Sequence, residues 1–234
     1  MSDRNLIPYF LVLGPILLVG AYMNWPASDA IGLRGADALI KEADSLMPLL
    51  IVATLGTIMV LSGVYLLISG MMENASGMNK QLLSVASVLI IITMAFFIVG
   101  MGSNVTVINE SGDDKVSAEE EAFTYADTDE QRDTQQNAFD TGNTVWSMST
   151  VTWGLSLILI GLVSFMMKRP ESVMEYVLPA LMPVGTLFLS LPIINNPELF
   201  GMVFPVVLLV HLIIGGLMLG GKVAVPGTVA EASE

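Results

Sequence analysis

The chain of 234 residues contains no cysteine. It therefore has no disulfide, thiolate nucleophile, iron–sulfur cluster or Cys-ligated zinc. Basic residues are also scarce, with nine Lys and Arg against 22 Asp and Glu, so the formal net charge is −13. This balance argues against nucleic acid as a partner and leaves no basic patch for anionic lipid headgroups. Without cysteine, the redox compartment stays undetermined.

Charged residues of either sign make up only 13 % of the chain, and hydrophobic residues make up 53 %. The charged share of a soluble domain is about twice as large. About 20 apolar residues in a helix cross the hydrocarbon core of a bilayer, and backbone groups there must bond within their own segment. Apolar runs of this kind lie at 6–23, 47–71, 82–101, 148–167, 173–194 and 200–221. The predicted fold is an all-α integral membrane protein, a bundle of six transmembrane helices with an acidic extramembrane loop that is partly helical.

A charged stretch separates the six predicted spans into two groups of three. Residues 103–143 hold 11 acidic residues against Lys115 and Arg132. Within this stretch, Ser117 followed by Glu120 resembles a capping box and predicts a short helix. A second short segment, near 36–46, is predicted either to lie as a short helix on the membrane surface or to be an early start of the second span. We divide the chain into a first membrane half, an acidic extracytoplasmic loop, a second membrane half and a cytoplasmic tail, at residues 1–101, 102–147, 148–221 and 222–234.

The positive charges of the short connections predict the orientation. They all fall on one side of the membrane: Arg4, Lys80, Lys168, Arg169 and Lys222. Positive charge favours the cytoplasm, so both termini are predicted there and the acidic loop outside, in a cell membrane or another energy-transducing membrane. Four aromatic residues cluster near the predicted outer boundary, either as interface anchors or in packing between helices: Tyr22, Trp25, Trp146 and Trp153.

Small residues recur on one stripe of several spans. Gly56, Gly63 and Gly70 are spaced seven residues apart in the second span. The fourth span repeats this spacing, and the sixth carries a small-xxx-small pair: Gly154 and Gly161, then Gly216 and Gly220. Such stripes let helix backbones approach closely within lipid. They predict helix packing, either inside the chain or against another subunit.

His211 is the only histidine and falls near the middle of the sixth span. An imidazole in hydrocarbon needs a hydrogen-bond partner, and an ionisable group inside a membrane deserves a functional hypothesis. His211 is a candidate axial ligand of a macrocycle, a candidate proton relay, or a polar contact between helices, and we favour the last. No cofactor is required by the sequence.

The fifth span contains three prolines, Pro179, Pro183 and Pro192, which free backbone carbonyls and bend a helix. Broken helices can offer carbonyls to an ion or a substrate, but they are more often tolerated kinks. Glu175 at the start of this span is best explained by the positive end of a helix. The acidic cluster at 127–133 lacks the glycine and terminal glutamate of an EF-hand loop and is read as a solvated face.

These features favour a non-catalytic structural or accessory subunit of a larger integral membrane complex. Its partners would be the lipid bilayer and other membrane protein subunits. The alternative is a channel or transporter for a small or neutral solute that uses the proline-broken fifth span. An intramembrane enzyme is third, because His211, Glu175 and hydroxyls are a poor inventory for hydrolysis or group transfer.

Overall fold

The computed structural model describes residues 6–26, 35–109, 129–168, 170–194 and 197–224. Within these ranges every regular element is a helix, which confirms the predicted all-α class. The helices are α1 (Ile7–Met23), α2 (Gly35–Lys41), α3 (Ala43–Glu73), α4 (Gly77–Asn109), α5 (Asp129–Met167), the 3₁₀ helix η1 (Val173–Val177), α6 (Leu181–Ile194) and α7 (Pro197–Leu219).

Five helical stretches are long and apolar enough to cross a membrane. They are Ala43–Glu73, Gly77–Asn109, Glu130–Met167, Val173–Ile194 and Leu199–Leu219. Helix α1 is also apolar but shorter, with 17 residues. Each of the six coincides with one of the apolar runs of the sequence, so the helices have the composition of a multi-pass membrane protein.

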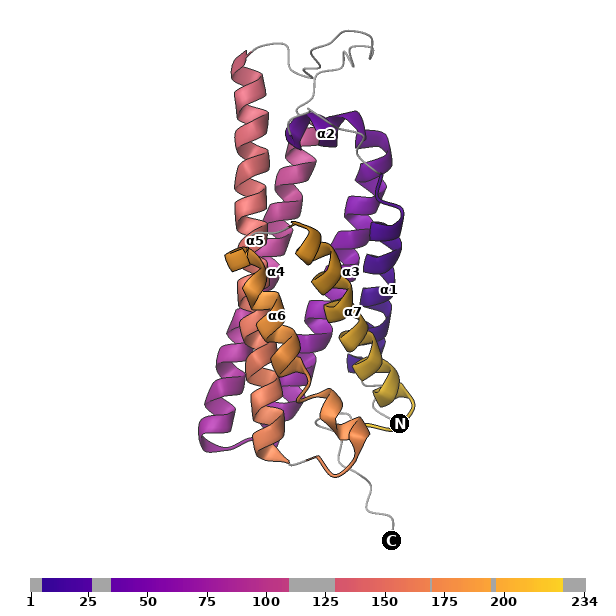
Figure 1. Ribbon diagram of the computed structural model, residues 1–234, viewed down its shortest axis with the longest axis vertical. Coiled ribbons are helices and arrows are strands. Elements are labelled where there is room, and N and C mark those ends of the chain that lie inside the picture. Colours follow the sequence, from indigo (N-terminus) through magenta and orange to yellow (C-terminus); the bar gives the residue numbers. More distant parts are fainter. Residues whose placement is uncertain (1–5, 27–34, 110–128, 169, 195–196, 225–234) are drawn as a thin grey trace.

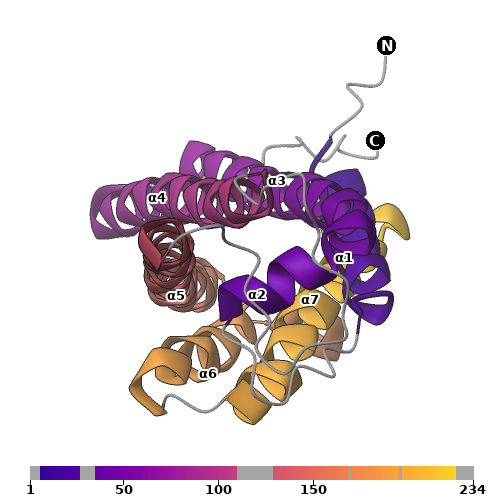
Figure 2. The same cartoon turned by 90° about the horizontal axis from the view of Figure 1, so that it is seen from above.

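The helices form a ring in chain order. Helix α1 packs on α3, α3 on α4, α4 on α5, α5 on α6 and α6 on α7, and α7 closes the ring against α1 (Figure 2). The buried core lies inside this ring and draws on all six long helices. The last helix of the chain is thus a direct neighbour of the first.

Three helices are much longer than the apolar runs that predicted them. Helix α5 has 39 residues, or about 58 Å at 1.5 Å per residue, and it rises well beyond the ends of α6 and α7 (Figure 1). The helices extend past the predicted span limits at residues 101 and 148, because α4 continues to Asn109 and α5 begins at Asp129. The helix predicted at Ser117 lies outside the described residues.

Helix α2 lies across the ring at the end where α5 projects, which we call the α2 end (Figures 1 and 2). It packs there on α4 and α5 through a small apolar cluster of its own. The members are Ala36, Leu39, Ile40, Val107, Ala138 and Phe139. Gly35, which begins α2, lies directly against the Phe139 ring, where a side chain would overlap it. The segment predicted near 36–46 is thus α2 followed by the first turn of α3.

Candidate functional site

A cavity of about 240 Å³ lies beneath α2, and we call it the capped pocket. Its walls come from α1, α2, α4 and α5. Aromatic side chains dominate them, with Tyr22 and Trp25 from the end of α1 and Phe139 and Trp146 from α5. Tyr22 and Trp25 stack with ring centroids 5.8 Å apart. Leu39 of α2, the helix that lies across the ring at this end, also lines the pocket.

Two amides, Asn104 and Asn143, supply side-chain polarity to the capped pocket besides the Tyr22 hydroxyl and the indole N–H groups. The Asn104 Oδ1 atom is buried and has no hydrogen-bond partner in the part of the chain that the structure describes. None of the described residues that line the pocket is a lysine, arginine, aspartate or glutamate. The pocket is therefore an uncharged aromatic chamber with a free hydrogen-bond acceptor.

Close approach of α4 and α5 forms one wall of the capped pocket. A Cβ on Gly100 would lie 3.1 Å from the Cβ of Trp146, and a Cβ on Gly142 would lie 2.7 Å from the Cβ of Ser103. These glycines let the two helices meet and hold the Trp146 indole against α4. Gly100 and Gly142 could not be predicted as contact residues, because they belong to no regular spacing of small residues.

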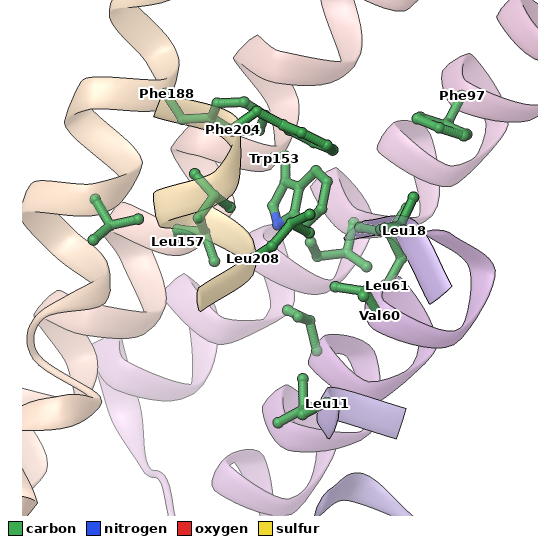
Figure 3. Close-up of a cluster of buried hydrophobic side chains, with 14 of the residues drawn as sticks. Leu11, Leu18, Val60, Leu61, Phe97, Trp153, Leu157, Phe188, Phe204 and Leu208 are labelled. Atoms are coloured by element: carbon green, nitrogen blue, oxygen red, sulfur yellow. The ribbon is translucent and has the colours of Figure 1, made fainter. Parts of the chain in front are cut away.

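An aromatic column continues from the capped pocket into the core, formed by Trp146, Phe200, Phe204, Trp153 and His211. Successive ring centroids are 5.1, 5.2, 6.5 and 5.6 Å apart. Figure 3 shows Trp153 at the centre of the buried cluster, close to the Phe204 ring. Aromatic rings thus pack against one another from the pocket into the core.

Trp153 is buried in the column and is only 1 % exposed. Of the two interpretations left open for Trp153, this burial supports packing between helices and not an interface anchor. The apolar run appeared to begin at Met148, but helix α5 begins at Asp129 and carries Trp153 into the middle of the ring. Tyr22, Trp25 and Trp146 do lie together at the α2 end, around the capped pocket.

His211 is 1 % exposed and bonds to its own helix. Its Nδ1 atom lies 2.6 Å from the carbonyl oxygen of Val207, four residues earlier. A carbonyl can only accept, so Nδ1 carries the hydrogen and Nε2 of the neutral ring is a bare acceptor. Neither Nε2 of His211 nor Nε1 of Trp153 has a hydrogen-bond partner among the described residues. A donor and an acceptor thus lie unpaired on neighbouring buried rings.

This geometry bears on the three roles predicted for His211. The polar contact that the structure provides is made within α7, to Val207, and not to another helix. A macrocycle would have to reach Nε2 in a residue whose ring lies against Trp153 in a packed core. A relay would need a second titratable group, and the ring that lies against the imidazole is the Trp153 indole, which does not titrate.

Hydroxyl groups join α4 to α5 and otherwise bond to their own helices. The Thr93 and Thr152 hydroxyls lie 2.7 Å apart across this seam, and Ser156 donates to the carbonyl of Ala86 at 3.1 Å. In α3, Thr54 and Thr57 donate to carbonyls four residues earlier. Most of these hydroxyls are used in packing, which weakens their candidacy as the lining of a solute path.

The fifth predicted span is interrupted, as its prolines require. It consists of η1, a turn at residues 178–180, and α6. The carbonyls around the break are bonded locally: Ala180 donates to Tyr176 at 2.9 Å, and Met182 donates to Pro179 at 3.0 Å. The Thr186 hydroxyl also donates to Met182. These bonds fit a tolerated kink better than an array of carbonyls open to an ion.

Glu175 lies in η1, at the end of the bundle opposite to α2. Its Oε2 atom is 3.5 Å from Nζ of Lys168 and accepts a hydrogen bond from the backbone of Glu171 at 3.1 Å. The two charged side chains are 32 % and 65 % exposed, so this is a surface ion pair of small energetic value. Glu175 is thus placed at the bundle surface and not in its interior.

The predicted glycine stripe of the second span, in α3, faces α1. A Cβ on Gly56 would lie 3.0 Å from the carbonyl oxygen of Gly14, and a Cβ on Gly63 would lie 3.0 Å from Leu11. Gly70 is buried farther along the same helix. Gly14 of α1 takes part in the same contact, since its own Cβ would lie 2.7 Å from the Val60 backbone nitrogen.

The stripe of the fourth span, in α5, faces α6 through Gly154 and Gly161. A Cβ on Gly154 would lie 2.8 Å from the Gly185 oxygen, and a Cβ on Gly161 would lie 2.5 Å from the Met182 nitrogen. By contrast, Gly216 of α7 and Gly220 in the turn that follows it are exposed. A Cβ on Gly216 would have no described neighbour within 4 Å.

The seam between α1 and α7 is closed at one end and open at the other. At the end of the seam that is distant from α2, a Cβ on Gly215 would lie 2.9 Å from the Cβ of Leu11 and from the carbonyl oxygen of Pro8. Toward the α2 end, Gly20 and Gly201 have no described neighbour within 4 Å of their Cβ positions. Two apolar depressions of about 490 and 540 Å³ follow the open part. They share Val19, Met23, Pro205 and Leu208, so they form one groove, the α1–α7 groove.

Among the described residues, no group of three or more His, Asp and Glu side chains is placed to hold a metal ion. Part of the acidic cluster at 127–133 lies outside these residues. A scan against family models found no match, and neither did searches of curated proteins and of solved structures. The candidate sites therefore rest on the chain's own geometry.

Proposed function

We propose that the chain crosses a membrane six times, with both termini in the cytoplasm, and acts as a non-catalytic subunit of a larger membrane protein complex. The α1–α7 groove is the observation that carries this proposal. It is apolar and lies on the outer face of the ring, and the exposed Gly20 and Gly201 lie along it. A helix of another subunit is the occupant that fits it best, because small residues let helices pack closely in lipid.

The exposed glycines of α7 and of the turn that follows it extend this surface. Gly201, Gly216 and Gly220 all lie on the outside of the ring, although most other packing glycines are buried inside it. In lipid, a helix face gains little from burial alone, so close backbone packing and interhelical hydrogen bonds dominate association. A helix face with exposed glycines beside a groove permits this close backbone packing.

The proposal predicts that filling the groove releases the partner. Gly201→Leu and Gly20→Leu place large side chains in the groove, and Gly102→Leu is the matched control, because Gly102 is exposed on α4 with no described neighbour within 4 Å. The full chain is extracted gently from its native membrane, and the particle mass and copurifying chains are measured. We expect loss of a stoichiometric partner in the first two variants and retention in the control. A lone polypeptide in the wild-type extract would overturn the proposal.

The absence of cysteine makes the topology directly testable. Single cysteines at Asn74, Asn137 and Lys222 place one thiol between α3 and α4, one on the projecting part of α5 and one after α7. An impermeant maleimide should label Asn137→Cys in intact cells and the other two only after permeabilisation. Labelling of Asn137→Cys and Lys222→Cys from the same side would refute six crossings with this orientation.

A channel or transporter for a small solute is the second candidate. The capped pocket favours it, because a chamber inside the ring is a place for a solute to bind. The aromatic column beneath the pocket and the bonded carbonyls of the fifth span weigh against it. Flux through liposomes that contain only this chain would favour transport over the subunit role.

A further inference from the structure

We propose that the capped pocket binds a small organic ammonium cation, such as a choline-like head. This inference does not depend on the subunit role. It rests on three features of the pocket: the aromatic rings that line it, an unpaired buried acceptor, and the sign of the charge around it.

The aromatic lining provides the main attraction. Tyr22, Trp25 and Trp146 come from two separate helices and converge on one cavity. The face of an aromatic ring attracts a cation, most strongly for tryptophan, and several rings together form the cage that recognises quaternary ammonium groups. The cavity of about 240 Å³ lies below the roughly 300–1,000 Å³ of typical ligand pockets, so it suits a small head rather than a macrocycle.

The polar groups favour a positive ligand over an anion. Asn104 lines the pocket, and its buried Oδ1 has no hydrogen-bond partner among the described residues, which makes it the candidate acceptor for a hydroxyl or N–H of the ligand. None of the described residues that line the pocket is a lysine or arginine. The described charged residues of α2, the start of α3 and the projecting part of α5 are mostly acidic: Asp37, Glu42, Asp44, Glu130, Asp133 and Asp140, against Lys41 and Arg132. This surplus raises the local concentration of cations.

The ligand's charge is tested with an isosteric pair. The full chain is placed in nanodiscs of phosphatidylglycerol, which has no ammonium group, and binding of choline is compared with that of 3,3-dimethylbutanol by calorimetry. The alcohol has the same shape but carries carbon in place of the charged nitrogen. We expect choline to bind at least tenfold more tightly. Equal affinities would overturn the proposal in favour of a neutral apolar ligand, and absence of choline binding in every lipid would overturn it altogether.

The site is tested with tryptophan variants. Trp146→Leu should weaken choline binding about tenfold, and Trp146→Phe, which keeps a ring, should weaken it less. Trp153→Phe is the matched control, because Trp153 lies in the aromatic column and not in the pocket, and it should bind like the wild type. Thermal unfolding of each variant checks that it is folded. Binding that is unchanged in Trp146→Leu would place the site elsewhere and refute the assignment.

Two sources share this chemistry, a free solute and the headgroup of a choline lipid. Repeating the titration in phosphatidylcholine nanodiscs distinguishes them. Free choline binding that is abolished there but present in phosphatidylglycerol nanodiscs identifies competition by the headgroup. Unchanged affinity identifies the free solute. Either result supports an ammonium site.

Discussion

At the scale of single residues, two buried polar atoms of the core, Nε1 of Trp153 and Nε2 of His211, have no hydrogen-bond partner among the described residues. A buried polar group without a partner costs about 1–3 kcal/mol. Trp153→Phe removes the unpaired N–H and keeps an aromatic ring beside Phe188 and Phe204, so the unfolding temperature should stay unchanged or rise. Trp153→Ala should cost about 3–5 kcal/mol through lost packing. Circular dichroism during heating in detergent measures both, and a large loss in Trp153→Phe would reveal a partner for the N–H.

His211→Leu tests the role of the imidazole in the same way. The variant removes the unpaired Nε2 and keeps an apolar side chain of moderate size, so we expect a folded protein with stability within about 1 kcal/mol of the wild type. An absorption spectrum of the purified protein is recorded alongside thermal unfolding. A visible band in the wild type that disappears in His211→Leu would contradict this expectation and support the axial-ligand hypothesis.

The sequence identified His211 as an unusual residue of the core, but the residues that surround it could not be predicted. The polarity of His211 in an apolar run marked it as unusual. That Trp153 would be the adjacent ring could not be predicted, because this contact depends on how α5 and α7 are rotated about their axes. The place of Asn104 in the pocket could not be predicted from the sequence, because the burial of its oxygen depends on the helices that pack around it.

At the scale of the helices, the contact between α5 and α6 depends on the absence of side chains at Gly154 and Gly185. A Cβ on Gly185 would lie 2.5 Å from the Gly154 oxygen, and backbone cannot move aside as a side chain can. We expect Gly185→Ala to lower the unfolding temperature clearly, by an amount typical of overpacking, about 1–3 kcal/mol. Gly102→Ala is the control and should be neutral or slightly stabilising, since alanine favours helix. Equal stability of the two variants would mean that α5 and α6 separate freely.

Helix α2 depends on the Phe139 ring more than on its own seven residues. So short a helix is unstable alone, so its order comes from packing on α4 and α5. Phe139→Ala should therefore increase hydrogen exchange in α2 while the exchange of α3 and α4 in the core stays protected. Mass spectrometry after proteolysis measures this difference. Protection of α2 equal to that of the wild type would show that another contact holds it.

Apolar runs predicted the number and the central parts of the long helices, because the requirement for about 20 apolar residues is written into composition. They missed the polar extensions, since residues 129–147 contain Gln, Asn, Asp and Thr and have no apolar stripe wide enough to indicate a helix. The break in the fifth span was predicted from its prolines. Which helices pair could not be predicted, because Gly14 and Gly185 carry no spacing that identifies them as the partners of Gly56 and Gly154.

At the scale of the whole molecule, two seams hold the halves of the ring together, α4 with α5 and α1 with α7. The chain connection between α4 and α5 should therefore be dispensable for assembly. Fragments 1–115 and 120–234, coexpressed in one membrane, should copurify through these seams. Gly100→Leu in the first fragment should weaken recovery, because its side chain meets Trp146 across the first seam, and Gly102→Leu should not. Separate fragments in the unmodified pair would show that the covalent link is required.

Because α1 and α7 are neighbours, the contact between them can form only late in synthesis. The ribosome delivers α1 first and α7 last, so α1 stays without its final neighbour until nearly the whole chain has been inserted. During that interval the face of α1 that later meets α7 is open to any other helix in the membrane. Truncation anywhere before residue 197 would leave that face permanently uncovered, and quality-control proteases could then tell an unfinished chain from a finished one.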